Sequence, residues 1–287
     1  MVAEGWQKWW KTFEQNAQKV NERLVELAEI KQGDKVLDIA TGIGEPAITA
    51  ARKVGIKGHV LATDISPQML KIAKQRAVSF GLQDIVEFKE IDAERIDIDL
   101  QPLLPPQYSS FNAVLCRWGL MFVPNLTSTL KSIYKVLSSG GKVSAAVWSE
   151  PAKVPKLYAA IDFVTKEMGI PFTITDNHSS TFAKILTPFS LANINILKNA
   201  LVEVGFKDIH IEYLTVIFEF TSAEDYVRFA KAIIAPIQEI LANETETRRE
   251  KIWKALTEEV KRKYVTANNN KSIIMDNETI CIVGRKS

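Results

Sequence analysis

Four short, mostly apolar runs divide the first half of the chain, and the segments between them carry apolar residues at helical spacing. The runs cover 36–39, 59–63, 85–91 and 111–116. Short apolar runs bounded by turn residues are typical of buried strands, whereas apolar positions three or four residues apart indicate helices. This alternation predicts a parallel, doubly wound sheet in an α/β fold.

Capping residues mark where some of these elements begin and end. Ser66 and Pro67 suit the N-cap and first turn of a helix, and Gly81 suits its end. A fifth strand is expected over 142–148, preceded by a turn at 138–141.

The second half of the chain has a looser pattern, which nevertheless predicts several elements. We expect a helix over 154–168, an irregular segment over 169–189, a helix over 191–204 capped by Ser190, a long strand over 207–220, helices over 223–265 with a break at 235–236, and a hairpin-like pair of segments at 273–275 and 279–283.

The first 31 residues are predicted to be helical and carry an aromatic stripe. Trp6, Trp9, Trp10 and Phe13 follow the i, i+3, i+4, i+7 spacing of one helix face. Such a stripe usually packs into a core. It also suits a lid that closes over a bound ligand, so both interpretations stay open.

Composition excludes several classes of protein. The 287 residues are 46% hydrophobic and 24% charged, with a net charge of +2, which does not call for a nucleic-acid or membrane partner. Two cysteines, Cys116 and Cys281, are too few for a disulfide framework or a cysteine-rich metal site. No apolar run approaches the roughly 20 residues of a membrane span. We therefore expect a cytoplasmic protein without a metal centre.

The most informative stretch joins the first strand to the next helix through a glycine turn. Gly42 and Gly44 allow the backbone to bend tightly and let a ligand approach closely. Pro46 suits the first turn of the helix, with Glu45 beside its positive end. A ligand here would meet free backbone amides.

Two acidic residues flank this turn. Asp38 lies four residues before Gly42, where a carboxylate would repel a pyrophosphate but can orient the turn or hold the amino group of a zwitterion. Asp64 ends the second strand about 20 residues beyond the glycines, a position from which a carboxylate can accept both hydroxyls of a ribose.

The Asp38-x-x-x-Gly42-x-Gly44 motif, followed by Asp64, resembles the class I S-adenosylmethionine-dependent methyltransferases. The run 63–70 (TDISPQML) is similar to their ubiquinone/menaquinone-biosynthesis-type small-molecule branch. The resemblance is strong over 33–148. It implies a seven-stranded Rossmann-like sheet of order 3-2-1-4-5-7-6 with helical cap insertions, in which strands at about 209–219 and 278–285 form the antiparallel pair.

The resemblance also implies a division of the chain. The expected parts are a helical lid (1–32), the S-adenosylmethionine-binding core (33–149), a cap or loop insertion (150–190), a core helix and strand (191–221), a helical cap insertion (222–269) and the last core strand (270–287).

In such enzymes an acidic residue after the third strand bonds the adenine amine, which is the role expected for Asp92. Arg117, at the end of the fourth strand, is expected to pair with the methionyl carboxylate, with an acidic substrate, or with a structural acid. The residues expected to contact the cofactor are Asp38, Ala40, Thr41, Gly42, Gly44, Asp64, Ile65, Met69, Asp92, Ala93, Glu94, Cys116 and Arg117.

The acceptor side is less well defined by the sequence. Methyl transfer depends mainly on alignment, and His178 in the cap is the candidate base for an oxygen acceptor, whereas His59 and His210 are expected to be structural. The residues expected to line the substrate are Trp10, Phe13, Trp118, Met121 and Phe189. These aromatics favour an apolar or aromatic small molecule.

Two other functions use the same turn. A nicotinamide-dependent oxidoreductase would share the glycines but tolerate Asp38 poorly, and a non-catalytic binding module would keep only the fold. The Cys116-Arg117-Trp118-Gly119 sequence argues against methylation of nucleic-acid bases. The sequence does not identify the acceptor atom, which can be oxygen, nitrogen, sulfur or carbon, or the oligomeric state.

Overall fold

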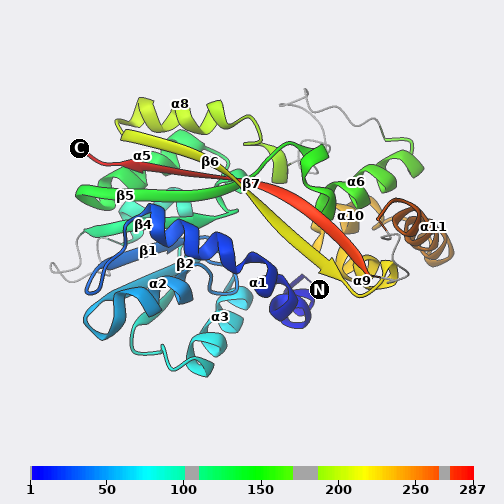
Figure 1. Ribbon diagram of the computed structural model, residues 1–287, viewed down its shortest axis with the longest axis horizontal. Coiled ribbons are helices and arrows are strands. Elements are labelled where there is room, and N and C mark those ends of the chain that lie inside the picture. Colours follow the sequence, from blue (N-terminus) through cyan, green and yellow to red (C-terminus); the bar gives the residue numbers. More distant parts are fainter. Residues whose placement is uncertain (1, 101–109, 171–186, 265–271) are drawn as a thin grey trace. The chain divides into compact units, whose positions relative to one another are not determined.

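The fold was analysed in a computed structural model that describes residues 2–100, 110–170, 187–264 and 272–287. Its seven-stranded sheet has the order β3-β2-β1-β4-β5-β7-β6, as predicted (Figure 1). The strands are β1 (Lys35–Ile39), β2 (His59–Asp64), β3 (Val86–Glu90), β4 (Phe111–Arg117), β5 (Leu137–Trp148), β6 (Lys207–Phe220) and β7 (Ile273–Arg285).

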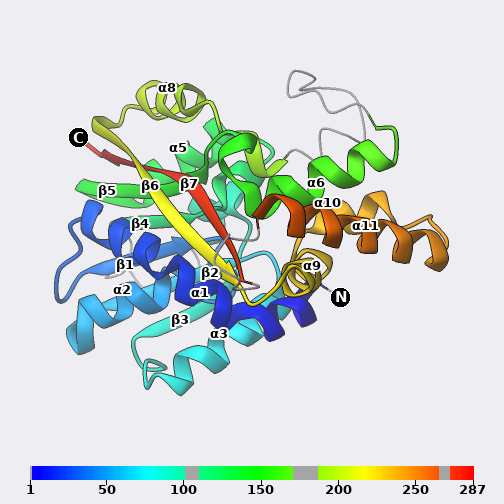
Figure 2. The same ribbon diagram turned by 45° about the vertical axis from the view of Figure 1, so that its right-hand side comes forward.

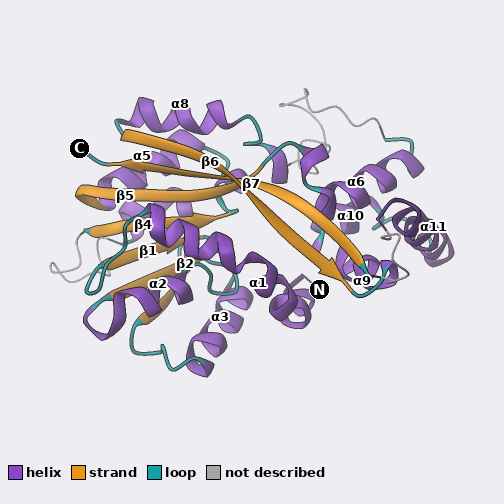
Figure 3. Cartoon of the chain, viewed as in Figure 1, coloured by secondary structure: helices purple, strands orange, loops and turns teal. Residues whose placement is uncertain are grey.

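Helices connect these strands (Figure 3). They are α1 (Val2–Leu27), α2 (Ala47–Val54), α3 (Pro67–Ser79), α4 (Ile96–Asp99), α5 (Leu126–Val136), α6 (Pro155–Glu167), α8 (Ile194–Val204), α9 (Ala223–Ile233), α10 (Ala235–Ile240) and α11 (Glu246–Tyr264).

The chain divides into two compact units, each with its own core. Unit 1 contains residues up to Asn16, Ser149–Ser190 and Thr215–Glu278, and unit 2 contains Ala17–Trp148, Leu191–Leu214 and Thr279–Ser287. Within unit 2, α2 and α3 lie on one face of the sheet and α5 and α8 on the other, as Figures 1 and 2 both show.

The parallel part of the sheet in unit 2 creates the crevice in which ligands bind in such folds. β1 pairs in parallel with β2 on one side and with β4 on the other. The chain leaves these two strands in opposite directions, because β1 leads to β2 and β4 leads to β5. Open α/β sheets bind ligands at the carboxyl ends of such a strand pair. The turn after β1 and the segment after β4 therefore face the same crevice.

The expected turn at 138–141 lies inside β5 rather than before it. Phe111 pairs with Leu137, but Ala113 pairs with Lys142, so the register shifts at this point. Gly140, with φ of +77°, lies in the irregularity. The glycines thus mark a bulge, a feature that sequence alone does not distinguish from a turn.

The hairpin expected near the carboxyl end is a single strand, β7. The polar run around Asn277 suggested a turn, yet the Asn277 side chain is fully buried. Its Nδ2 donates to the backbone oxygens of Met275 (2.7 Å) and Val216 (3.3 Å), and its Oδ1 accepts from the Lys156 amide (2.9 Å). A satisfied buried amide therefore replaces the expected break.

The cap expected for the helix at 191–204 is also corrected. α8 begins at Ile194, and the residue before it, Asn193, accepts a hydrogen bond from the Asn195 amide at 3.2 Å. Ser190 lies too early to cap it. The predicted break near 235–236 is confirmed, because α9 ends at Ile233 and α10 begins at Ala235.

The aromatic stripe of α1 packs inside unit 1. The rings of Trp6 and Phe13 meet edge to face at 4.8 Å, and the Trp9 ring meets Phe229 at 5.6 Å. Phe13 also contacts Phe218 at 5.4 Å. This is the core packing that a helical stripe most often signifies. The lid role remains a prediction.

Candidate functional site

The carboxylate of Asp38 ties the end of β1 to the start of α2. Its Oδ2 accepts hydrogen bonds from Thr41 Oγ1 at 2.5 Å and from the Ala47 amide at 3.0 Å. The side chain is completely buried. Its other oxygen, Oδ1, has no hydrogen-bond partner among the described residues. One oxygen therefore shapes the glycine turn, and the other retains the capacity to accept a hydrogen bond.

Burial controls the ionisation of Asp38. Removal from water raises the pKa of the Asp38 carboxyl from 3.8 to about 8, although the hydrogen bonds from Thr41 and Ala47 and the positive charge of Arg117 act in the opposite direction. At neutral pH this environment therefore favours a protonated Asp38. A cation placed beside Oδ1 would favour the ionised form.

Asp64, at the end of β2, connects two loops of the crevice. Its Oδ2 accepts from the Gly42 amide at 2.8 Å and its Oδ1 accepts from the Ser66 amide at 2.9 Å. The side chain is half-buried, and burial raises the pKa of this carboxyl. The Ile65 amide also bonds this carboxylate. A carboxylate has about four acceptor positions, so acceptor capacity remains for a hydroxyl-bearing ligand.

The backbone on both sides of the crevice adopts the left-handed conformation. Ala40 has φ of +53° and Trp118 has φ of +55°, although neither is a glycine. A Cβ on Gly119 would lie 2.6 Å from the Ala40 Cβ and 2.7 Å from the Cys116 Sγ. The two strand ends therefore approach too closely for any side chain at position 119, and strain is concentrated where a ligand would bind.

The segment after β3 lies on the same edge of the sheet. Asp92 Oδ1 accepts from the Glu94 amide at 3.0 Å, which starts a short 3-10 turn, and Glu94 Oε1 accepts from the Asn125 amide at 2.9 Å. After β2, the Ile65 side chain is 70% exposed. Met69 lies close to Gly42, within 3.7 Å of where a Cβ would stand. Exposed apolar side chains here suit the face of a purine ring.

The end of β4 is more buried than the sequence suggests. Trp118 stacks on Trp148 with ring centroids 4.1 Å apart, and its Nε1 donates to Thr279 Oγ1 at 2.9 Å. Met121 and Cys116 are also buried, and burial raises the pKa of the Cys116 thiol to about 12, so this thiol stays protonated. Trp118 is only 9% exposed, which leaves little of its ring for a substrate.

A sequence profile of the ubiE/COQ5 methyltransferase family matches residues 11–216. The chain belongs to this family. Similar proteins include the ubiquinone/menaquinone biosynthesis C-methyltransferases UbiE of Pseudomonas savastanoi pv. phaseolicola and Pseudomonas fluorescens. Each is 29% identical over 209 residues, which cover 72% of this chain and 74% of the relative.

Solved structures share the fold of this chain. A putative methyltransferase from Bacillus halodurans has a TM-score of 0.52 at 23% identity, over 93% of this chain and 98% of that one. The YcgJ protein of Bacillus subtilis has a TM-score of 0.55 at 13% identity, over 94% and 98%. A phosphoethanolamine N-methyltransferase of Haemonchus contortus, bound to S-adenosylhomocysteine, has a TM-score of 0.53 at 19% identity, over 96% and 56%.

This family membership identifies the chain as an S-adenosylmethionine-dependent methyltransferase acting on a small-molecule acceptor. It replaces the nicotinamide oxidoreductase and the non-catalytic module considered from the sequence. Within the described part of the chain, no helix is both long and apolar enough to cross a bilayer.

The methyltransferase site fits its cofactor in two respects. The partnerless Asp38 Oδ1 is a buried acceptor that the ammonium group of S-adenosylmethionine would satisfy. The Gly42 amide is oriented by Asp64 and carries no side chain that would block an adenosyl group.

Two polar contacts around the site were not identified from the sequence, one at the glycine turn and one at the end of β4. The Arg76 guanidinium on α3 contacts Glu45 at 3.3 Å and donates to the Ile43 carbonyl, and both side chains are buried. Asn21 on α1 accepts a hydrogen bond from Arg117 at 2.7 Å. Asn21 falls among the buried apolar positions of its helix, and a polar residue in such a stripe was the available signal.

The remaining predicted residues lie elsewhere. Trp10, Phe13 and Phe189 belong to unit 1, where Phe13 and Phe189 are buried and Trp10 is half-buried. His178 lies outside the described residues. His59 begins β2, 3.7 Å from Glu87, and His210 on β6 lies 3.4 Å from Glu212.

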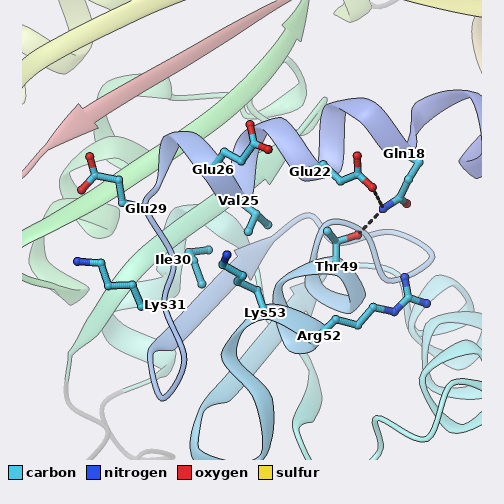
Figure 4. Close-up of a pocket in the computed structure, with 10 residues that line it drawn as sticks. All are labelled: Gln18, Glu22, Val25, Glu26, Glu29, Ile30, Lys31, Thr49, Arg52 and Lys53. Carbon is cyan, nitrogen blue, oxygen red and sulfur yellow. Dashed lines mark hydrogen bonds between the residues drawn. The ribbon is translucent and has the colours of Figure 1, made fainter.

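A hollow of about 630 Å³ lies elsewhere in unit 2, between α1 and α2 (Figure 4). Glutamates from α1, among them Glu22 and Glu26, form one wall, and Arg52 and Lys53 from α2 form part of the other. None of the residues expected to bind the cofactor or substrate lines this hollow.

We expect Asp38→Asn to change how stability depends on pH. The pKa of Asp38 is raised from 3.8 to about 8 in the folded protein. Between these two pH values the unfolded chain ionises this carboxyl while the folded protein keeps it protonated. The free energy of unfolding of the wild type therefore falls as the pH rises from 3.8 toward about 8. The loss approaches about 1.4 kcal/mol per pH unit within this window. The asparagine variant lacks this loss.

Urea unfolding at pH 5, 6, 7 and 8 measures the difference, with the exposed Asp84→Asn as the matched control. The gap in unfolding free energy between Asp38→Asn and the wild type should widen in favour of the variant as the pH rises. Parallel pH curves would contradict the buried, protonated carboxyl.

Removing the charge partner of Glu45 should destabilise unit 2. Arg76→Met leaves the Glu45 carboxylate buried without its cation, a change that costs about 3–5 kcal/mol. The double variant Glu45→Gln/Arg76→Met should recover much of this loss. Denaturant unfolding of the wild type and the three variants, including Glu45→Gln, measures the coupling, and additive losses would show that the two groups act independently.

Proposed function

We propose that this enzyme transfers the methyl group to a ring carbon of a small, flat, hydroxylated aromatic acceptor. The relatives at 29% identity are named as C-methyltransferases of ubiquinone and menaquinone biosynthesis. A hydroxyl group makes its aromatic ring electron-rich, so that a ring carbon can attack the methyl group and the ring then loses a proton. Oxygen, nitrogen and sulfur acceptors are the alternatives that the experiment below separates.

The observation that carries the cofactor part of this proposal is the buried Asp38 Oδ1 without a partner. We assign it to the ammonium group of the cofactor. The ammonium would bring the missing hydrogen-bond donor and would favour ionised Asp38, whose pKa burial raises to about 8. A nicotinamide cofactor would place a pyrophosphate near this carboxyl, where like charges repel.

Asp64 is assigned to the ribose. Its two oxygens hold the Gly42 and Ser66 amides and retain acceptor capacity for the two hydroxyls of a sugar. Asp92 is assigned to the adenine amine, with the Ala93 amide reading the ring and the exposed Ile65 covering its face. Asp64 ends β2 and Ile65 follows it, while Asp92 and Ala93 follow β3, the neighbouring strand.

The cofactor supplies an activated methyl group on a sulfonium, and the task of the protein is alignment. Holding two reactants in line can contribute roughly 7–11 kcal/mol to the rate. The assigned residues fix the adenosine and the amino-acid ends, and the rigid strand ends at Ala40 and Trp118 limit the freedom of the site. His178 is proposed as a base only if the acceptor atom is oxygen.

The Asp64→Ala variant tests the ribose assignment. We expect its affinity for S-adenosylhomocysteine to fall at least tenfold, because losing a desolvated hydrogen-bond partner costs about 1–3 kcal/mol. Isothermal titration calorimetry measures the change, with the exposed Asp84→Ala as control. Equal affinity of Asp64→Ala and wild type would remove the assignment.

The acceptor proposal is tested by incubating the enzyme with methyl-labelled S-adenosylmethionine and a panel of hydroquinones, phenols, aromatic amines and thiols. We expect label in the hydroquinones or phenols, and NMR spectra in which one ring proton is replaced by a methyl group. Label found only on oxygen, nitrogen or sulfur would overturn the carbon assignment while leaving the methyltransferase activity intact.

A further inference from the structure

A buried hydrogen bond links the first helix to the end of the fourth strand. Asn21 on α1 is fully buried, and its Oδ1 accepts from Arg117 Nη1 at 2.7 Å. Its Nδ2 donates to Gln18 Oε1 on the same helix at 3.3 Å. Both partners lie in unit 2, although 96 residues separate them along the chain. Burial makes this contact costly to lose.

The guanidinium of Arg117 is also held by an aromatic ring. It lies 4.9 Å from the ring centroid of Trp118. That ring cannot turn freely, because it stacks on Trp148 and its Nε1 donates to Thr279. Arg117 is only 8% exposed. The hydrogen bond and the ring contact together give the guanidinium a defined orientation.

Arg117 lies within electrostatic range of Asp38, since its positive charge lowers the pKa of that carboxyl. The site therefore combines a cation and an anion at the facing ends of β4 and β1, which are neighbouring strands. A zwitterionic group matches this arrangement, with its carboxylate toward Arg117 and its ammonium toward Asp38.

We propose that Asn21 is a positioning residue that orients Arg117 to receive the carboxylate at the amino-acid end of the cofactor. The inference rests on the proposed function and extends it to a residue of α1. Guanidinium and carboxylate form their strongest pair when two parallel hydrogen bonds align, so the orientation of the guanidinium matters.

The amide of Asn21 suits this role better than a carboxylate would. It accepts one N–H of Arg117 and fixes the plane of the guanidinium, but it carries no charge. Asn21 therefore orients Arg117 without adding a negative charge beside it. An aspartate at position 21 would keep the geometry and add a negative charge that opposes a ligand carboxylate.

The test compares two ligands that share adenosine and differ in the amino-acid end. S-adenosylhomocysteine has both the ammonium and the carboxylate, whereas 5′-methylthioadenosine has neither. Calorimetry gives the affinity of each ligand for the wild type, Asn21→Ala, Asn21→Asp and the control Asn16→Ala. Asn16 lies on the same helix, and its Nδ2 donates to the Thr12 carbonyl of that helix at 2.6 Å.

We expect Asn21→Ala to lower the affinity for S-adenosylhomocysteine about tenfold or more, because this is the effect of losing one buried hydrogen-bond partner. The affinity for 5′-methylthioadenosine should stay within about twofold, which also shows that the variant is folded. Asn21→Asp, which has nearly the same shape, should show the same selective loss. The control Asn16→Ala should bind both ligands as the wild type does.

The outcomes separate the two proposals. If the wild type binds neither ligand, the proposed cofactor site is wrong. Suppose that the wild type binds S-adenosylhomocysteine. If Asn21→Ala and Asn21→Asp lower the affinity for both ligands equally, or change neither affinity, the positioning role is wrong and the cofactor site stands. A selective loss in Arg117→Met that is not increased by adding Asn21→Ala would show that the two residues act together.

Discussion

The arrangement of the site depends on one buried carboxylate. Asp38 accepts hydrogen bonds from Thr41 and from the Ala47 amide, so it closes the turn between β1 and α2 that contains Gly42 and Gly44. Its complete burial raises the free-energy cost of a charge there, and the same burial makes the carboxylate responsive to a cation. Structural and ligand-binding roles are thus combined in two oxygens of one side chain.

Other polar groups support this turn from outside. Arg76 on α3 donates to the Ile43 carbonyl and contacts Glu45 within the turn, and Asp64 at the end of β2 accepts from the Gly42 amide. These contacts come from two segments of the chain beyond the turn. A turn held at several points loses little conformational entropy when a ligand binds, which favours affinity without additional contact area.

The strand order and the glycine turn could be predicted from the sequence, because they depend on local patterns and on a family motif. The alternation of apolar runs and helical stripes is sufficient for the parallel half of the sheet. The bulge inside β5 and the continuous β7 could not be predicted, since they depend on partners distant in sequence. An asparagine such as Asn277 is typical of a turn, and only its hydrogen bonds with Val216 and Lys156 show why it lies inside a strand.

In the site too, contacts between residues that are distant in sequence could not be predicted. Asp38, Gly42 and Asp64 carry a recognisable spacing, and the structure brings Gly42 and Asp64 into direct contact. The link between Asn21 and Arg117 has no such spacing, because the two residues lie on elements joined only by folding. Trp118 appeared to be a substrate contact, but its stacking on Trp148 uses one face of its ring.

The absence of a side chain at Gly119 has a consequence for how enzymes of this kind acquire new substrates. The Ala40 Cβ and Cys116 Sγ occupy the space that any larger residue would need. If the loop after β4 were randomised, variants with any side chain at position 119 would clash with Ala40 and Cys116. Nearly all of them would fail to fold correctly, whichever acceptor is used for selection. Substitutions that change the acceptor are therefore confined to the positions on either side of Gly119, while Gly119 itself stays unchanged.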